Sequence, residues 1–319
     1  MQYYILRRIL LAVPALIGVT VLIFLAMRVI PGDPLSSVGG EGELYILSDK
    51  ELMEVRHSLG LDRPLAIQYL DWMADVLRGD LGFSFWRKQD PIRNLVFRRG
   101  PITLQIALMS TVIAWLIGLP VGIISAMRRN SLLDYVLRLL VTLFMAIPNF
   151  WLALTMLLIT ITFFSWRPPL EIAYLWTDPI PNLQMTIGPA IALGTAFGAI
   201  IARMSRATLL EVAREDYVRT ARAKGLGERI VIARHVLRNS LLPVVTISGL
   251  QLAAVLGGAV AVERAFAVPG LGFTLIYAIV ERDWMLIQNL VLLFGVATVV
   301  INLAVDLTYA WLDPRIRYQ

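Results

Sequence analysis

Long apolar stretches divide the chain into segments separated by polar, charge-rich connections. A helix needs about 20 mostly apolar residues to cross the roughly 30 Å hydrocarbon core of a bilayer. Because the stretches have this length and carry almost no charge, we predict an all-α integral membrane protein. It has six transmembrane helices, over residues 9–30, 102–127, 139–166, 186–202, 241–262 and 286–312.

The first and fourth spans differ from the others. The first opens like a signal peptide, with arginines at 7–8 ahead of an apolar run. Its apolar run is too long for a signal peptide, and residues 28–31 offer no small-residue cleavage site, so we interpret it as a retained helix. The fourth is short and contains Gly188, Gly194 and Gly198. Small residues let helices approach closely, which predicts a position inside the bundle.

Basic residues in the short connections predict the orientation. The connections on the side of the two termini hold 16 lysines and arginines, and the opposite ones hold three. Cytoplasmic loops carry the excess of Lys and Arg, so both termini are expected in the cytoplasm. The net charge of +6 then reflects membrane topology, and we expect no nucleic-acid partner.

Composition excludes several classes of protein. The chain is 58% hydrophobic and 16% charged, whereas a soluble domain is about half apolar and a quarter charged. With no cysteine and two histidines, it has no thiolate site and no histidine-rich metal cluster. A phosphate-binding P-loop needs Lys followed by Ser or Thr, and none of Lys50, Lys88 and Lys224 meets this condition. We therefore expect no catalytic residue, cofactor or metal on this chain.

The segment 31–101 is predicted to be a small helical extracytoplasmic insertion. Ser48 and Glu51 form a capping box ahead of one amphipathic helix, and Pro64 precedes a second. The insertion is either a lid packed on the bundle or a docking surface for an external partner. Three arginines before the second span are expected to snorkel toward lipid headgroups: Arg93, Arg98 and Arg99.

The segment 203–240 is the most distinctive feature of the chain. Apolar positions 209, 210, 213, 217 and 221 lie on one face of a helix, and 226, 230, 233, 237 and 241 on one face of a second. Gly225 and Gly227 separate the two. The pattern fits either interfacial helices on the inner leaflet or a helical knob that enters a groove of a cytoplasmic partner.

Residues 216–226, DYVRTARAKGL, and 235–243, HVLRNSLLP, resemble the EAA loop of ABC-importer permeases, specifically the dipeptide and oligopeptide branch. Arg219 and Thr220 stand where the broad family has Glu and Ala, and the peptide branch shares this change. Further segments resemble the same branch, so that the likeness covers essentially the whole chain: 31–34, 59–64, 79–84, 147–151 and 269–272.

The resemblance implies a single permease domain over 1–319 with a type I ABC importer bundle in a plasma (inner) membrane. Members pair with a second permease, often a different chain, and with two ATPase subunits that bind ATP and Mg²⁺. An extracytoplasmic binding protein delivers the solute. The segment 203–240 would be the cytoplasmic coupling loop, through which the ATPases drive alternating access. Its coupling residues would be Asp216, Tyr217, Arg219, Thr220, Ala221, Lys224, Gly225 and His235.

Di- or oligopeptides are the solutes that the resemblance implies first, with nickel chelates, glutathione and sugars as alternatives. Pro120 and Pro148 are expected to kink the second and third spans. Four polar residues are candidates for lining the pathway, with interhelical hydrogen bonding as the alternative for each: Asn149, Thr246, Ser248 and Gln251.

Other functional classes explain the sequence less well. Within the predicted spans the ionisable residues are Arg28 and Asp306, both toward span ends. A proton- or ion-coupled secondary carrier generally needs such groups midway across the membrane. A standalone channel leaves the 203–240 segment unexplained. An intramembrane enzyme needs a paired nucleophile and base or a metal site, and the sequence offers neither.

Overall fold

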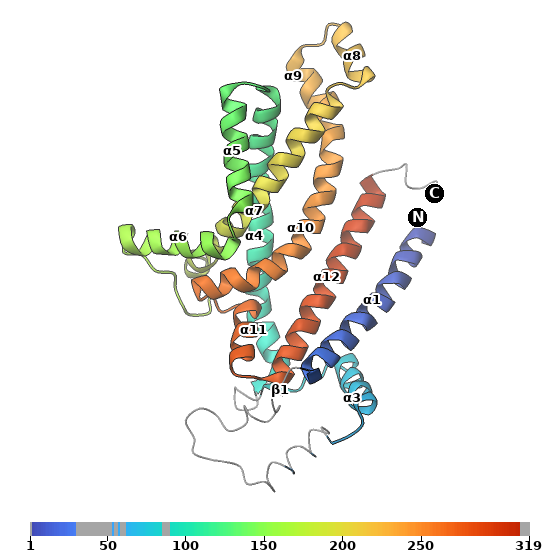
Figure 1. Ribbon diagram of the computed structural model, residues 1–319, viewed down its shortest axis with the longest axis vertical. Helices are drawn as coiled ribbons and strands as arrows, with labels where there is room; N and C mark the ends of the chain where they lie inside the picture. Colours follow the sequence, from blue (N-terminus) through green and yellow to red (C-terminus); the bar gives the residue numbers. More distant parts are fainter. Residues whose placement is uncertain (1, 30–52, 54–56, 58–61, 85–89, 313–319) are drawn as a thin grey trace.

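The computed structural model describes residues 2–29, 53, 57, 62–84 and 90–312, and these form a helical bundle (Figure 1). The capping box at Ser48 and Glu51 lies outside the described residues. The helices are α1 Gln2–Val29, α3 Leu65–Leu77, α4 Ile92–Met127, α5 Leu132–Ala146, α6 Asn149–Phe164, α7 Pro179–Val212, α8 Asp216–Ala223, α9 Glu228–Ile230, a π-helix Val231–Val236, α10 Leu237–Phe266, α11 Leu271–Val280 and α12 Trp284–Leu312. Two short antiparallel strands, β1 Phe83–Ser84 and β2 Asp90–Pro91, pair with Phe83 opposite Pro91.

Five helices are long and apolar enough to cross a membrane, namely α1, α4, α7, α10 and α12. The third predicted span is instead a bent pair, α5 and α6, whose axes differ by 101°. Pro148 explains the break, because the residue before a proline is pushed out of the helical region. Ile147 accordingly has φ −77° and ψ 125°. The kink predicted at Pro148 is present, whereas α4 continues through Pro120.

Glycines bring α4 and α7 into close contact. A Cβ atom added to Gly118 of α4 would lie 2.5 Å from the carbonyl oxygen of Gly198 on α7. A Cβ atom at Gly194 would lie 2.7 Å from a methyl carbon of Ile113. α7 is also the most buried of the five long helices. The interior position predicted for the glycine-rich span is therefore confirmed. It depends on the glycines, because their lack of a side chain lets α7 approach α4 closely.

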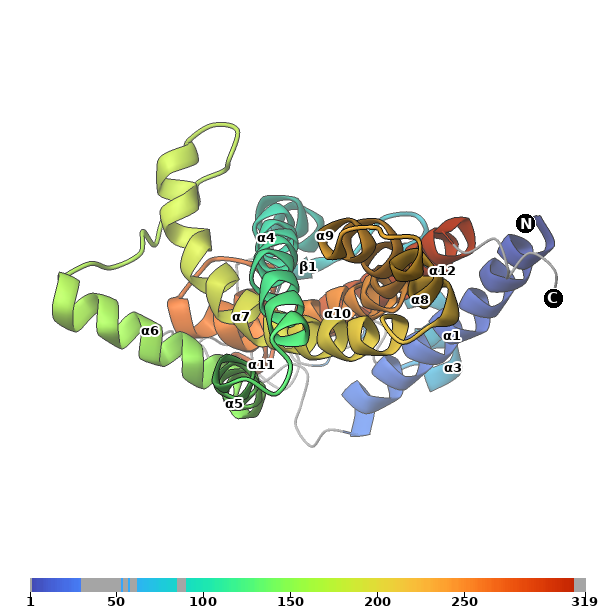
Figure 2. The ribbon, with the colours of Figure 1, turned by 90° about the horizontal axis from the view of Figure 1, so that it is seen from above.

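An apolar core fills the space between α4, α7 and α10, and includes Ile106, Leu193, Phe197, Val255 and Ala259. α12 packs against α10 and α11, and α1 packs along α12 (Figures 1 and 2). α3 lies across α1 and α12, where Trp72 is buried with Phe24 and Leu292. The predicted insertion thus contributes a helix that packs on the bundle.

The arginines before the second span do not all snorkel. They lie within α4, which begins ten residues before the predicted span. Arg99 is only 7% exposed and donates a hydrogen bond to Thr274 Oγ1 at 2.6 Å, so the snorkelling prediction is wrong for this residue. Arg98 forms an ion pair with Asp90.

The bundle has two distinct ends. One carries α8 and α9, together with the first residues of α1 and the last of α12, and we call it the α8 end (Figure 1). The other carries α3, α11 and the two strands, and we call it the α3 end. With the bent pair counted as one span, six crossings bring the start of α1 and the end of α12 to the same end of the bundle.

Candidate functional site

α8 projects from the α8 end between the last turn of α7 and the π-helix (Figure 1). One face of α8 is buried, through Val218 and Ala221, which are 0% and 6% exposed. They pack in an apolar cluster with Leu209 of α7 and with Val231 and Val236 of the π-helix. The burial of this face fixes α8 to α7 on one side and to the π-helix on the other.

Local sequence explains where α8 ends. Lys224 is the C-cap, and Gly225 follows it with φ +79°. A glycine in the left-handed region just after the C-cap is a common helix terminator, because it has no Cβ to clash there. Gly227 then caps α9 with an ordinary φ of −59°. The turn predicted from the two glycines is therefore present, and only Gly225 requires a glycine for its backbone conformation.

Polar contacts tie α8 to the segments on both sides. Arg222 pairs with Glu228 of α9 at 2.9 Å and donates to the carbonyl oxygen of Ala213 at 3.1 Å. Hydrogen bonding to Glu228 raises the pKa of Arg222. The Tyr217 hydroxyl donates to the carbonyl oxygen of His235 at 3.3 Å. These contacts bridge the glycine turn and hold α8 in one orientation.

The outer face of α8 is polar and solvent-exposed. Asp216 and Arg219 form an i,i+3 ion pair whose side chains are 96% and 76% exposed. Thr220 and Lys224 are exposed beside them. Of the eight predicted coupling residues, Tyr217, Ala221 and His235 anchor the helix, and the others lie on its outer face or in the turn. Seven of the eight thus lie in α8 or the turn after it, and the eighth, His235, lies in the π-helix that contacts Tyr217.

The apolar stripes predicted for 203–240 are only partly correct. The first helix is interrupted, because α7 ends at Val212 and α8 begins at Asp216. In the second, Leu226 and Ile230 are 39% and 51% exposed, whereas Val231 and Val236 are buried. Leu226 lies in the turn before α9 and Ile230 ends α9, so both precede the π-helix. The wider turn of the π-helix then moves the residues after Ile230 out of the 3.6-residue register.

A buried ion pair lies beneath this end of the bundle. Asp134, at the start of α5, is fully buried and accepts two hydrogen bonds from the Arg206 guanidinium of α7, at 2.8 and 2.9 Å. Ser125 of α4 donates to the same carboxylate at 2.5 Å. The pair joins three helices. We did not identify it from sequence because both residues fall just outside the predicted spans.

The four candidate pathway residues do not form one surface. Ser248 is buried on the core face of α10, and its hydroxyl donates to the Val244 carbonyl at 2.7 Å. Thr246 likewise donates to a carbonyl of its own helix. Asn149 lies on α6, 3.5 Å from where a Cβ at Gly258 would stand. Gln251 lies two turns from Gly258 on the same side of α10. At 100° per residue, Thr246 therefore points away from Ser248 and Gln251 on α10, and Asn149 faces α10 from α6.

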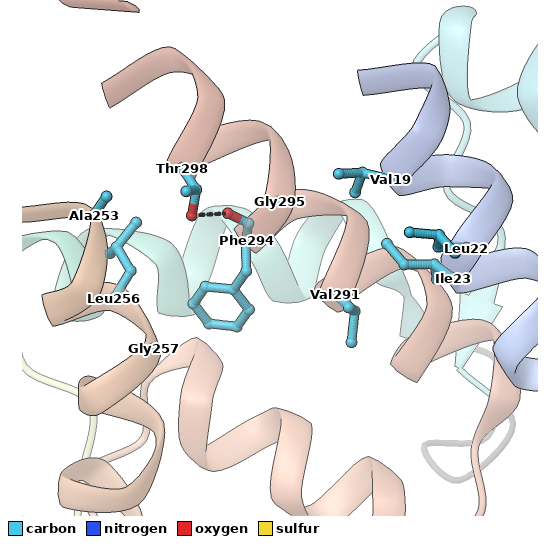
Figure 3. Close-up of a pocket in the computed structure, with 10 residues that line it drawn as sticks. All are labelled: Val19, Leu22, Ile23, Ala253, Leu256, Gly257, Val291, Phe294, Gly295 and Thr298. Atoms are coloured by element: carbon cyan, nitrogen blue, oxygen red, sulfur yellow. Dashed lines mark hydrogen bonds between the residues drawn. The ribbon is translucent and has the colours of Figure 1, made fainter. Parts of the chain in front are cut away.

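An apolar cavity lies near these helices (Figure 3). Its volume is about 370 Å³, and Figure 3 shows it between α1, α10 and α12, with the Phe294 ring pointing into it. The Thr298 hydroxyl is bound to the Phe294 carbonyl at 2.8 Å. The lining carries no charged side chain, so this cavity cannot pair with the charged ends of a solute.

A second buried polar cluster lies at the α3 end. Glu263 of α10 is 0% exposed and accepts hydrogen bonds from Thr103 Oγ1 at 2.6 Å and from the Phe273 amide at 3.0 Å. A Cβ at Gly270 would stand 2.3 Å from the carboxylate, so the glycine permits this contact. We did not identify Glu263 from sequence, because it immediately follows the predicted span. The available signal was an acidic residue six positions before a Pro-Gly-x-Gly turn.

The comparisons with known proteins agree with this architecture. Residues 118–318 match the family described as "Binding-protein-dependent transport system inner membrane component", and residues 1–107 match its companion N-terminal family. The chain is 38% identical over 320 residues to the oligopeptide transport system permease protein AppB of Bacillus subtilis, covering both chains completely. It is 37% identical over 338 residues to the dipeptide transport system permease protein DppB of Alkalihalophilus pseudofirmus, again covering both completely.

The fold also has a counterpart among solved structures. An inward-facing MetNI methionine ABC transporter contains a chain that matches with a TM-score of 0.57 at 21% identity, over 69% of this chain and 96% of that one. This match supports the type I ABC importer permease fold. Permeases of such importers work with other permease, ATPase and binding-protein components. The chain therefore belongs to the family of binding-protein-dependent transport system inner membrane components, as a multi-pass, non-enzymatic transport permease subunit.

Proposed function

We propose that this chain forms, with a second permease, the pathway of an ATP-driven importer for di- or oligopeptides. The support for the solute class is the set of full-length relatives at 36–38% identity, which are named as oligopeptide, dipeptide or peptide permeases. An extracytoplasmic binding protein would deliver the peptide. The second permease would be a different chain, as is common in this family.

The α8 end would face the cytoplasm. Its short connections carry most of the basic residues of the chain, and cytoplasmic loops concentrate Lys and Arg. The two termini would then be cytoplasmic as well. The opposite end, with α3, would be extracytoplasmic. There the apolar side chains of Leu70 and Leu77 are 64% and 81% exposed, on a helix that a delivering protein would reach.

The observation that carries the proposal is the two-sided character of α8. Its inner face is fixed to α7 and to the π-helix by Val218 and Ala221, and its outer face presents exposed charges. A helix seated by this outer face in a groove of an ATPase would transmit the movement of that ATPase. Because α8 is attached on both sides, the movement would pass to α7 and α10, which form the centre of the bundle.

ATP and Mg²⁺ would bind to two partner ATPase subunits, and this chain would bind neither. The residues of this chain would couple the ATPases to the bundle and guide the solute through it. Asp216, Arg219, Thr220 and Lys224 would contact the ATPase, while Tyr217, Ala221, Gly225 and His235 would keep α8 in position. The pathway itself would open between α10 and helices of the second permease, where Asn149 and Gln251 border the same side of α10.

Reconstitution in vesicles tests the proposal. The chain is co-expressed with the second permease and the ATPases, and uptake of labelled di- and tripeptides is measured with the binding protein present. We expect ATP-dependent uptake by the full assembly and none by the chain alone. Arg219→Glu combined with Lys224→Glu should abolish retention of the ATPases on the purified permease, whereas Arg129→Glu, an exposed arginine at the same end, should not.

Two results would contradict the proposal separately. Uptake by the chain alone would exclude the ATP-driven mechanism. Unchanged ATPase retention in the α8 double variant would instead favour a lipid-surface role for α8. The ligand that co-purifies with the binding protein identifies the solute independently, and a nickel chelate, glutathione or a sugar there would replace the peptide assignment without affecting the coupling.

A further inference from the structure

A small basic cavity lies between α4, α5 and α7 at the α8 end, apart from α8 itself. Its volume is about 200 Å³. Three arginine side chains line it, together with the hydroxyl-bearing Ser125 and Thr142 and the aliphatic Val121, Val141, Ala202 and Ala207: Arg138, Arg203 and Arg206. The cavity thus combines guanidinium groups, hydroxyl groups and an apolar wall.

The charge in this cavity is only partly neutralised. Arg206 pairs with Asp134, and this is the buried ion pair described above. Within the described residues, Arg138 and Arg203 have no carboxylate partner. Arg138 lies over the Tyr135 ring, 4.8 Å from its centre, which leaves its charge uncompensated. Two positive charges therefore remain in excess beside the cavity.

Asp134 has a positioning effect on this site. Its carboxylate binds Arg206 through both Nε and Nη2, so this guanidinium is held in one orientation at the cavity wall. Gly122 lets the helices close around the cavity, since a Cβ there would lie 2.7 Å from the Ala202 carbonyl oxygen. Arg206 is consequently fixed by the fold, and the exposed Arg138 and Arg203 line the same cavity beside it.

The surroundings of the cavity indicate where its ligand comes from. α5 forms one wall and lies at the edge of the bundle in both views (Figures 1 and 2). Its outer side chains are apolar and exposed, with Leu132 at 80% and Leu139 at 70%. In a membrane protein such a face meets lipid. Arg138 thus lies on a lipid-facing helix, directly before Leu139 and less than two turns after Leu132.

We propose that this cavity binds the phosphate group of an anionic lipid headgroup. Arginine binds phosphate oxygens through charge-assisted, often bidentate hydrogen bonds. Basic pockets between transmembrane helices bind acidic headgroups by this means. The volume is below the roughly 300–1,000 Å³ of sites for drug-sized ligands, which suits a headgroup and excludes a whole peptide. Free inorganic phosphate shares the chemistry, and the exposed apolar face of α5, along which acyl chains would lie, favours the lipid.

Native mass spectrometry of the detergent-purified permease assembly tests this site. Phosphatidylglycerol, phosphatidylcholine and inorganic phosphate are added in separate titrations, and bound molecules are counted. The variant Arg138→Gln with Arg203→Gln keeps Arg206 and therefore keeps Asp134 paired. The control Arg128→Gln with Arg129→Gln removes two exposed charges from the neighbouring α4–α5 turn.

We expect the wild-type assembly to retain phosphatidylglycerol in preference to phosphatidylcholine. The cavity variant should lose one bound phosphatidylglycerol per permease, with at least a tenfold weaker apparent affinity, and the control should not. Retention of inorganic phosphate alone, lost in the cavity variant, would overturn the lipid as source. Equal retention in wild type and cavity variant, or equal losses in variant and control, would overturn the site.

Discussion

The hydroxyl group of Tyr217 joins α8 to the beginning of α10. It donates a hydrogen bond to the carbonyl oxygen of His235, at 3.3 Å, and accepts one from Asn239 Nδ2, at 2.7 Å. One atom of the short helix therefore contacts both the π-helix and the first turn of a membrane-spanning helix. Through this contact, a movement of α8 reaches α10 directly and does not depend on the glycine turn.

Removal of this hydroxyl should weaken coupling more than folding. Tyr217→Phe loses two hydrogen bonds near the surface, each worth about 1 kcal/mol, and keeps the ring. We expect a small decrease in thermal stability but several-fold less peptide uptake per ATP hydrolysed in reconstituted vesicles. Tyr135→Phe is the control, since the Tyr135 hydroxyl makes no hydrogen bond within the described residues. Equal uptake per ATP in Tyr217→Phe and wild type would refute this direct connection.

The glycine turn offers a matched pair of substitutions. Gly225→Ile places a β-branched residue at φ +79°, where the left-handed conformation costs roughly 1–2 kcal/mol. Gly227→Ile places the same side chain at φ −59°, and neither glycine has an atom within 4 Å of a Cβ added there. We expect the Gly225→Ile variant to insert normally into the membrane but to hydrolyse ATP without uptake. The Gly227→Ile variant should keep ATP hydrolysis coupled to uptake. Identical behaviour of the two variants would show that the backbone conformation is unimportant.

The Asp134–Arg206 pair should be required for stability. Arg206→Leu leaves a fully buried carboxylate without its cation, which costs about 3–5 kcal/mol. We expect a large drop in the unfolding temperature of the detergent-purified chain. The double variant Asp134→Val with Arg206→Met should regain much of the loss. Arg219→Leu, which breaks the exposed pair with Asp216, should change stability by at most about 1 kcal/mol. A mild effect of Arg206→Leu would mean that water reaches Asp134.

The contact between α4 and α7 should not tolerate a side chain at its closest point. Gly118→Val puts a Cβ 2.5 Å from the Gly198 carbonyl oxygen, so the helices must separate. We expect a loss of roughly 3 kcal/mol or more, at the upper end for overpacked cores, and reduced yield of folded protein. Gly18→Val is the control on α1, because a Cβ at Gly18 meets no atom within 4 Å. The two variants can be compared by size-exclusion profiles and thermal unfolding.

Several features of the fold could be predicted from sequence because they depend on neighbouring residues. A membrane span is identified by its length and apolar content, and a helix stop by Gly225 after a polar cap. The break at Pro148 follows from the missing amide and the ring of one residue. The predicted lining residues stay a prediction. Asn149, Thr246, Ser248 and Gln251 were chosen for polarity, and the structure divides them between α6 and two sides of α10.

Other features depend on contacts between distant segments. The stripe through Leu226 and Ile230 assumed an unbroken 3.6-residue period, which the π-helix interrupts. The burial of Arg99 required Thr274, and that of Glu263 required Thr103 and the turn at Gly270. No local pattern distinguishes these residues from charges that remain at the membrane surface.

By itself, the sequence determined that this protein is a multi-pass membrane permease, how its basic residues are distributed and where the glycine turn after α8 lies. Apolar length, charge asymmetry and glycine positions act over a few residues, so they can be read along the chain. The tertiary structure alone decided which charges are buried, and that Asp134 pairs with Arg206 while Arg138 and Arg203 remain unpaired within the described residues beside a cavity. A buried charge is stable only where other helices supply its partners, and their approach depends on the whole bundle.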